Sequence, residues 1–113
     1  SRNLNRLAMR AFMGLARTGG IASNGSGDYV IAFSTAPQLR VAHAPTESVH
    51  TASYLHNDFI SPLFLAAIEA AEEAIVNSLF AATTTAGVNG AIAQAIPIDE
   101  VVALMARHGR IHS

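Results

Sequence analysis

The sequence contains no cysteine and no lysine. Without cysteine, a disulfide framework, a thiolate metal site and a cysteine nucleophile are all excluded. A chain free of cysteine suits both the cytoplasm and the periplasm, so its localisation stays open between the two. Because lysine is absent, all seven basic residues are arginines.

Charge of either sign is also scarce. Charged residues make up 13% of the 113 residues, against about 25% in an average globular protein. We interpret this shortage, together with an apolar content of 50%, as a sign that a partner covers part of the surface. The net charge of -1 gives no electrostatic reason to expect nucleic acid or an acidic membrane as a partner.

No segment has the pattern of a signal peptide or of a membrane span. Arginines interrupt the first apolar stretch, and the longest apolar segment, residues 62–82, carries three glutamates. Arg2, Arg6 and Arg10 recur every four residues, so on a helix they would form one basic stripe. Because no aromatic residues interleave to stack bases, we interpret that stripe as a solvated face.

Apolar spacing predicts helices near both ends of the chain. Residues 4–15 follow the three-four spacing of an amphipathic helix, and Gly19 and Gly20 come where a left-handed cap belongs. Residues 99–108 form a shorter helical pattern that ends at Gly109.

A longer helix is predicted in the middle of the chain. Ser61 supplies a side-chain oxygen for the N-cap, and Pro62 follows at the first helical position. Glu69, Glu73 and Asn77 share one face of this helix. The opposite, apolar face comprises Phe64, Ile68, Ala71, Ile75, Leu79 and Ala82.

The remaining segments predict loops and a few short strands. Residues 21–28 are rich in Gly, Ser and Asn and predict a loop. Residues 29–33 are apolar on both alternating faces, as in an inner strand covered on two sides. Residues 39–43 and 91–96 are further extended candidates, and residues 83–90 are a turn-rich break. This order predicts an α/β fold with too few strands to be complete, so residues 1–113 are expected to form one incomplete domain.

The densest group of polar residues precedes the predicted inner strand. Ser26 and Asp28 are two residues apart, so in an extended chain their side chains face the same site. The adjacent Gly25 and Gly27 would let a substrate or another backbone approach closely. A hydroxyl beside a carboxylate can orient a nucleophile. The alternative is a turn in which Asp28 caps backbone amides.

Other residue patterns predict no cofactor or metal site. Gly19 and Gly20 with Arg17 could be taken for an anion-binding nest, but a helix cap explains the glycines more simply, and no phosphate-binding glycine motif is present. A metal site needs three or four convergent ligands. The histidines show no such spacing; they are His43, His50, His56, His108 and His112.

Several blocks of sequence resemble the C-terminal part of the L-aminopeptidase/D-esterase family, which includes the DmpA-like and β-peptidyl aminopeptidases. The blocks are RLAMRAFMGLARTGG at 6–20, SGDYVIAFST at 26–35, NDFISPLF at 57–64, EEAIVN at 72–77 and LMARHGR at 104–110. They occur in the family's order and with similar spacing.

The resemblance implies a fold, an activity and partners. Members of this family adopt an αββα four-layer sandwich and cut their own precursor into an α-polypeptide and a β-polypeptide, whose new first residue is the nucleophile. The resemblance therefore implies an α-polypeptide partner, a tetramer of αβ pairs, and release of N-terminal L, D or β amino acids from peptides, amides or esters. It implies no metal and no organic cofactor.

The resemblance also assigns roles to the candidate site. A terminal α-amine titrates near pH 8 in model peptides, so it can accept the proton of the hydroxyl on its own residue. In the family a Ser-Gly-acid element orients that hydroxyl, and it maps onto Ser26 and Asp28. Some relatives carry glutamate, one methylene longer, in place of Asp28.

The start of the chain departs from the family pattern. In the family the nucleophile opens a buried strand that precedes the first helix, whereas here Ser1 runs directly into the helical pattern. We therefore expect the nucleophile in a segment upstream of Ser1. Two alternatives stay open: an acyltransferase of the same fold, and an interaction module without a nucleophile.

Overall fold

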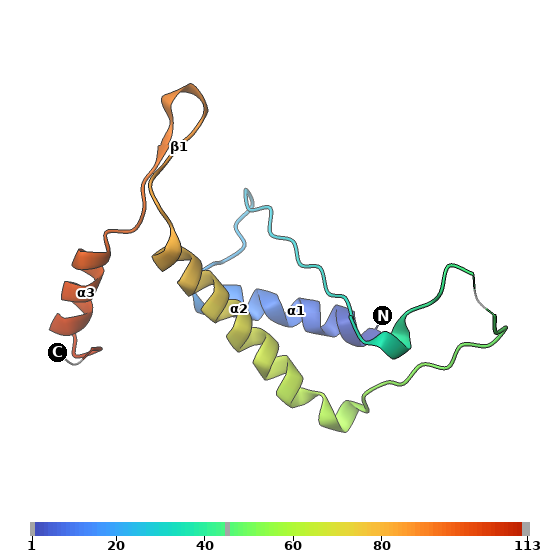
Figure 1. The fold of residues 1–113 in the computed structure, drawn as a ribbon. Helices are drawn as coiled ribbons and strands as arrows, with labels where there is room; N and C mark the ends of the chain where they lie inside the picture. The colour runs from blue at the N-terminus through green and yellow to red at the C-terminus, as the bar shows by residue number, and fades with distance from the viewer. Residues whose placement is uncertain (1, 45, 112–113) are drawn as a thin grey trace. The chain divides into compact units, whose positions relative to one another are not determined.

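The computed structural model describes residues 2–44 and 46–111, and Ser1 lies outside these ranges. Helices and short strands make the chain α/β (Figure 1). The elements are α1 (Arg2–Arg17), the 3₁₀ helices η1 (Pro37–Leu39) and η2 (Asn57–Phe59), α2 (Ser61–Ala81), β1 (Thr85–Ala86), the 3₁₀ helix η3 (Val88–Gly90), β2 (Ile92–Ala93) and α3 (Ile98–Arg107). The chain divides into two compact units, Ser1–Glu72 and Glu73–Ser113, with the boundary inside α2.

Helix α1 confirms the first predicted helix and its cap. Gly19 has a φ of +93°, a conformation that glycine adopts without steric cost. The Gly20 N–H donates to the Leu15 carbonyl at 3.2 Å, and the Gly19 N–H donates to the Ala16 carbonyl at 3.1 Å. This pair of bonds is a Schellman motif, which satisfies carbonyls that the helix end leaves without partners.

In the first unit, α1 packs closely against the beginning of α2. Gly14, the buried residue of α1, is where the helices meet, since a Cβ built there would lie 2.6 Å from the Ile68 carbonyl oxygen. An ion pair at 3.1 Å joins Arg17 to Glu72 across the same contact. Within the described ranges, Ile60 is the one large apolar side chain that is fully buried, at 2% exposure.

Helix α2 is confirmed, but it begins differently from the prediction. Ile60 already has helical dihedral angles, with φ −87° and ψ −19°, and its carbonyl accepts the first bond from the Phe64 N–H at 3.2 Å. Ser61 is therefore inside the helix instead of capping it, because η2 leads directly into the helical path. None of the helices in the described ranges combines the length and hydropathy of a membrane span.

The two strands predicted between α1 and α2 are not formed. Residues 29–33 run as irregular chain, with Tyr29 and Ile31 exposed by 89% and 87%. A strand is held by hydrogen bonds to a neighbouring strand, and the described residues provide none for this segment. Residues 39–43 are also not a strand: Leu39 belongs to η1, and residues 40–43 have no pairing strand among the described residues.

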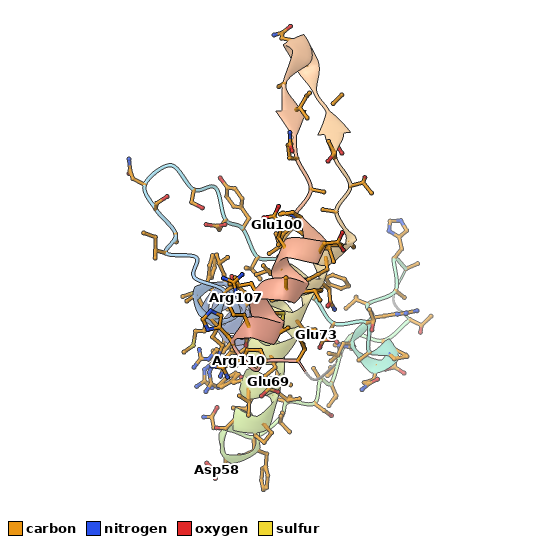
Figure 2. The ribbon with its side chains drawn as sticks, turned by 90° about the vertical axis from the view of Figure 1, so that its left-hand side faces the viewer. Asp58, Glu69, Glu73, Glu100, Arg107 and Arg110 are labelled. Atoms are coloured by element: carbon orange, nitrogen blue, oxygen red, sulfur yellow. The ribbon has the colours of Figure 1, made fainter. Side chains whose placement is uncertain are left out.

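The second unit contains a short hairpin followed by α3. Strands β1 and β2 pair antiparallel, with Thr85 opposite Ala93. This confirms part of the extended segment predicted at residues 91–96, whereas β1 was missed. Helix α3 confirms the last predicted helix; Glu100 lies in its first turn and Arg107 in its last (Figure 2). A negative charge in the first turn and a positive charge in the last turn both interact favourably with the helix dipole.

Candidate functional site

The candidate site is an exposed loop in which the backbone makes a turn just before Ser26 and Asp28. The Ser26 N–H donates to the Ser23 carbonyl at 2.8 Å, so Asn24 and Gly25 occupy the centre of a turn. Asparagine and glycine suit such positions, because both tolerate unusual dihedral angles and asparagine can bond its own backbone. The predicted loop at residues 21–28 is confirmed.

The structure brings Ser26 and Asp28 together. The Ser26 Oγ–H donates a hydrogen bond to Asp28 Oδ2, and both residues are exposed. The two-residue spacing therefore does place both side chains on one side of the chain. Among the hydrogen bonds of the described residues, none runs from a backbone N–H to the Asp28 carboxylate, which leaves the capping alternative without its expected bond.

This hydrogen bond has a direct chemical consequence for the serine. Because the carboxylate takes the hydroxyl proton as a hydrogen bond, the Ser26 oxygen keeps lone pairs that can accept a proton from a second hydroxyl or an amine. A carboxylate held behind the serine would also stabilise a positive charge that develops at such an amine. The pair can therefore orient a nucleophile that another part of the protein supplies.

The glycines beside the pair leave space around it. A Cβ built at Gly25 would have no neighbour within 4 Å, and one built at Gly27 would lie 3.6 Å from Tyr29 Cε2. Packing among the described residues therefore does not require glycine at either position. The open space suits the approach of a substrate or of another backbone.

The histidines do not form a metal site in the part of the chain that the structure describes. No group of three or more His, Asp or Glu side chains lies close enough there to hold an ion. His56 has a local role instead: its Nδ1 accepts the Asp58 N–H at 3.4 Å, beside the N-terminal end of α2, where Figure 2 labels Asp58. His112 lies outside the described residues.

Sequence reasoning missed a second polar cluster, around Arg6. Arg6 Nη1 donates to Asn57 Oδ1 at 2.9 Å and to Asn3 Oδ1 at 3.2 Å. Arg6 and Arg10 are half-buried and only Arg2 of the predicted stripe is exposed, so the interpretation as a solvated face is wrong for two of its three members. The spacing placed these arginines on one face but could not show that distant residues cover it.

Comparisons with known proteins identify relatives over nearly the whole chain. The sequence profile of peptidase family S58 matches residues 1–93. The beta-peptidyl aminopeptidase BapA of Sphingosinicella microcystinivorans is 43% identical over 109 residues, which are 96% of this chain and 27% of that protein. BapA of Sphingosinicella xenopeptidilytica is 33% identical over 102 residues, which are 90% of this chain and 25% of that protein.

A solved structure is similar as well. The crystal structure of the PH0078 protein from Pyrococcus horikoshii OT3 superposes with a TM-score of 0.85 and 49% sequence identity, over 97% of this chain and 30% of that chain. The chain thus spans 27% and 25% of the lengths of the two curated relatives. Their names refer to proteins several times longer than the segment that matches.

Proposed function

Because the chain belongs to peptidase family S58, we propose that it is part of an aminopeptidase that releases N-terminal residues from peptides, amides or esters. The names of the two curated relatives support this activity. The observation that carries the proposal is the hydrogen bond from Ser26 to the Asp28 carboxylate. It is the arrangement that an orienting pair requires, in an open loop beside glycines.

The proposed enzyme is a self-processing serine hydrolase of the N-terminal-nucleophile type. Backbone cleavage of a precursor frees the α-amine of a serine outside residues 1–113, and that amine accepts the proton of its own hydroxyl. The hydroxyl oxygen attacks the substrate carbonyl, the protonated amine returns the proton to the leaving amine, and water then hydrolyses the acyl ester. Ser26 orients the attacking hydroxyl, and Asp28 stabilises the protonated amine.

We further propose that the complete protein is an αββα four-layer sandwich with an α-polypeptide, assembled as a tetramer of αβ pairs. Residues 29–33 are then an inner strand whose neighbours come from outside the described chain. Their apolar character on both faces and the exposure of Phe33, which is 75%, support this view. An isolated apolar segment of this kind is stable only when strands and helices cover it.

The test is the change of Ser26→Ala in the complete precursor, with Ser23→Ala as the matched control in the same loop. If Ser26 orients the nucleophile, its loss should lower kcat for a β-peptide or amino-acid amide by about two to four decades. Ser23 contributes a backbone carbonyl to the turn, so its variant should keep near-normal kcat. Self-cleavage is scored on a denaturing gel, because an uncleaved variant would be inactive for another reason. Near-normal kcat in fully cleaved Ser26→Ala would contradict the proposal.

A further inference from the structure

Arg6 and Arg10, the arginine pair, hold two guanidinium groups against one aromatic ring. The Cζ atoms of Arg6 and Arg10 lie 4.8 Å and 4.1 Å from the centroid of the Phe64 ring. Each distance is within the range of a cation–π contact. Because the two residues are four apart on α1, their side chains are neighbours on one face of the helix. Two like charges are thus kept close together at a half-buried position.

The described residues provide no negative charge for this pair. Its hydrogen-bond partners are neutral: the side-chain oxygens of Asn3 and Asn57 for Arg6, and a backbone carbonyl for Arg10. The other ionisable groups on α1, on the adjoining residues 56–60 and on the part of α2 in this unit are Arg2, Arg17, His56, Asp58, Glu69 and Glu72.

One of these carboxylates already has a partner: Glu72 is paired with Arg17 at 3.1 Å. Asp58 lies beside His56, whose Nδ1 accepts the Asp58 N–H. None of the carboxylates in the described ranges lies within ion-pair distance of either member of the arginine pair. A carboxylate suits two adjacent guanidinium groups, because arginine binds a carboxylate through two parallel hydrogen bonds.

We propose that the arginine pair binds the carboxylate of an aspartate or glutamate on a polypeptide segment outside residues 1–113, which packs over this face of α1. This inference does not depend on the proposed enzymatic activity. Charge complementarity requires an anion, and the length of the relatives indicates its source. The matched segment is 27% of one curated relative, so most of such a protein lies elsewhere in its sequence.

The surroundings favour a protein segment over a small anion. Met9, which precedes Arg10, and Leu63, which precedes Phe64, are exposed by 61% and 47%. Apolar surface of this kind is normally covered by other parts of a protein. A segment that covers these side chains also removes water from the guanidinium groups. Buried charges without a partner are strongly unfavourable, so the covering segment should bring a carboxylate with it.

The experiment compares thermal unfolding of the complete protein and of three variants between pH 7 and pH 3. The double variant Arg6→Met with Arg10→Met removes both charges but keeps long side chains that can contact the Phe64 ring. The double variant Arg6→Lys with Arg10→Lys keeps the charges. Arg2→Met removes an exposed arginine of the same helix and is the matched control.

A bound carboxylate makes a specific prediction for the pH dependence. Its pKa in the folded protein lies below the value of about 4 that it has in the unfolded chain. Its contribution to stability is therefore complete above that unfolded value and is lost as the pH falls through the folded pKa. The double methionine variant should melt several degrees below the wild type at pH 7, and this gap should narrow toward pH 3. The lysine variant should keep most of the wild-type dependence of melting temperature on pH. The Arg2→Met variant should melt close to the wild type at every pH.

Three results would overturn the proposal. A difference in melting temperature between wild type and the double methionine variant that is equal at every pH would mean that the arginines act only through Phe64. No difference at any pH would mean that the two arginines are simply solvated. A gap that appears only after a peptide with a free C-terminal carboxylate is added would assign the pair to a ligand instead of a protein segment. If the double methionine variant does not fold, the same pH series is run on Arg10→Met, which leaves the Arg6 bond to Asn57 intact.

Discussion

Gly14 of α1 faces Ala71 of α2 so closely that a Cβ built on Gly14 would lie 2.7 Å from the Ala71 Cβ. The Ile68 carbonyl oxygen would be closer still, at 2.6 Å. Because the second neighbour is backbone, it cannot move away as a flexible side chain does. Glycine at this position thus sets the distance between the two helices.

The change of Gly14→Ala should destabilise the complete protein. Alanine gains about 0.8–1 kcal/mol of helix propensity, but overpacking a close contact typically costs about 1–3 kcal/mol, and here the helices themselves must separate. We expect a net loss of about 1–2 kcal/mol in the free energy of unfolding, measured by urea titration. Ala16→Gly, at an exposed position of the same helix, measures the difference in unfolding free energy that helix propensity alone causes between alanine and glycine. A more stable Gly14→Ala protein would show that the helices are not held at this distance.

The charge of Asp28 should matter more than its exact length. In the complete precursor, Asp28→Asn keeps the size of the side chain but removes the charge that would stabilise a protonated α-amine, so kcat should fall by about two to four decades. Asp28→Glu keeps the charge on a side chain that is one methylene longer, so most of the activity should remain. Both are measured on fully cleaved enzyme. Equal activity in the Asn and Glu variants would leave the carboxylate without a catalytic role.

The chain of residues 1–113 should be unstable when it is expressed without partners. Large apolar side chains are exposed along its length, including Ile21 at 85% and Val88 at 84%. Such surface promotes association of unfolded chains. We expect aggregation or a non-cooperative thermal transition, observed by size exclusion and circular dichroism. A monodisperse monomer with a sharp transition would argue against an incomplete domain.

Metal chelation should leave the complete enzyme active. The proposed base is an amine, and the part of the chain that the structure describes brings no three metal-binding side chains together. Activity measured after dialysis against EDTA should equal that of the untreated protein, whereas a serine-directed acylating reagent should abolish it. Loss of activity in EDTA with recovery on adding zinc would disprove the amine mechanism.

Local sequence signals predicted the three α-helices and the glycines that end α1 and α3. Gly19 and Gly109 both have positive φ, at +93° and +64°, in the positions where glycine was expected to end α1 and α3. The proximity of Ser26 to Asp28 was also predictable, because residues two apart need no other part of the fold to meet. These features depend on interactions between residues near each other in the sequence.

Strand formation was not predictable from local signals alone. The apolar run at residues 29–33 has the composition of a strand, but its hydrogen bonds must come from another segment, and the described chain does not provide one. Strand β1 was missed because Thr85 and Ala86 have no distinctive sequence pattern. They are extended because β2 pairs with them.

The three helices, the glycine caps of α1 and α3 and the proximity of Ser26 to Asp28 follow from patterns within short stretches of residues, which also carry the family resemblance. The contacts between distant residues, such as Arg6 with Asn57 at 2.9 Å and Gly14 with Ala71, come from the packing of the folded chain. The difference lies in the range over which these interactions act. Helix propensity, capping and i to i+2 contacts act within a few residues, whereas the burial of an arginine pair or the closeness of two helices depends on how separate segments pack.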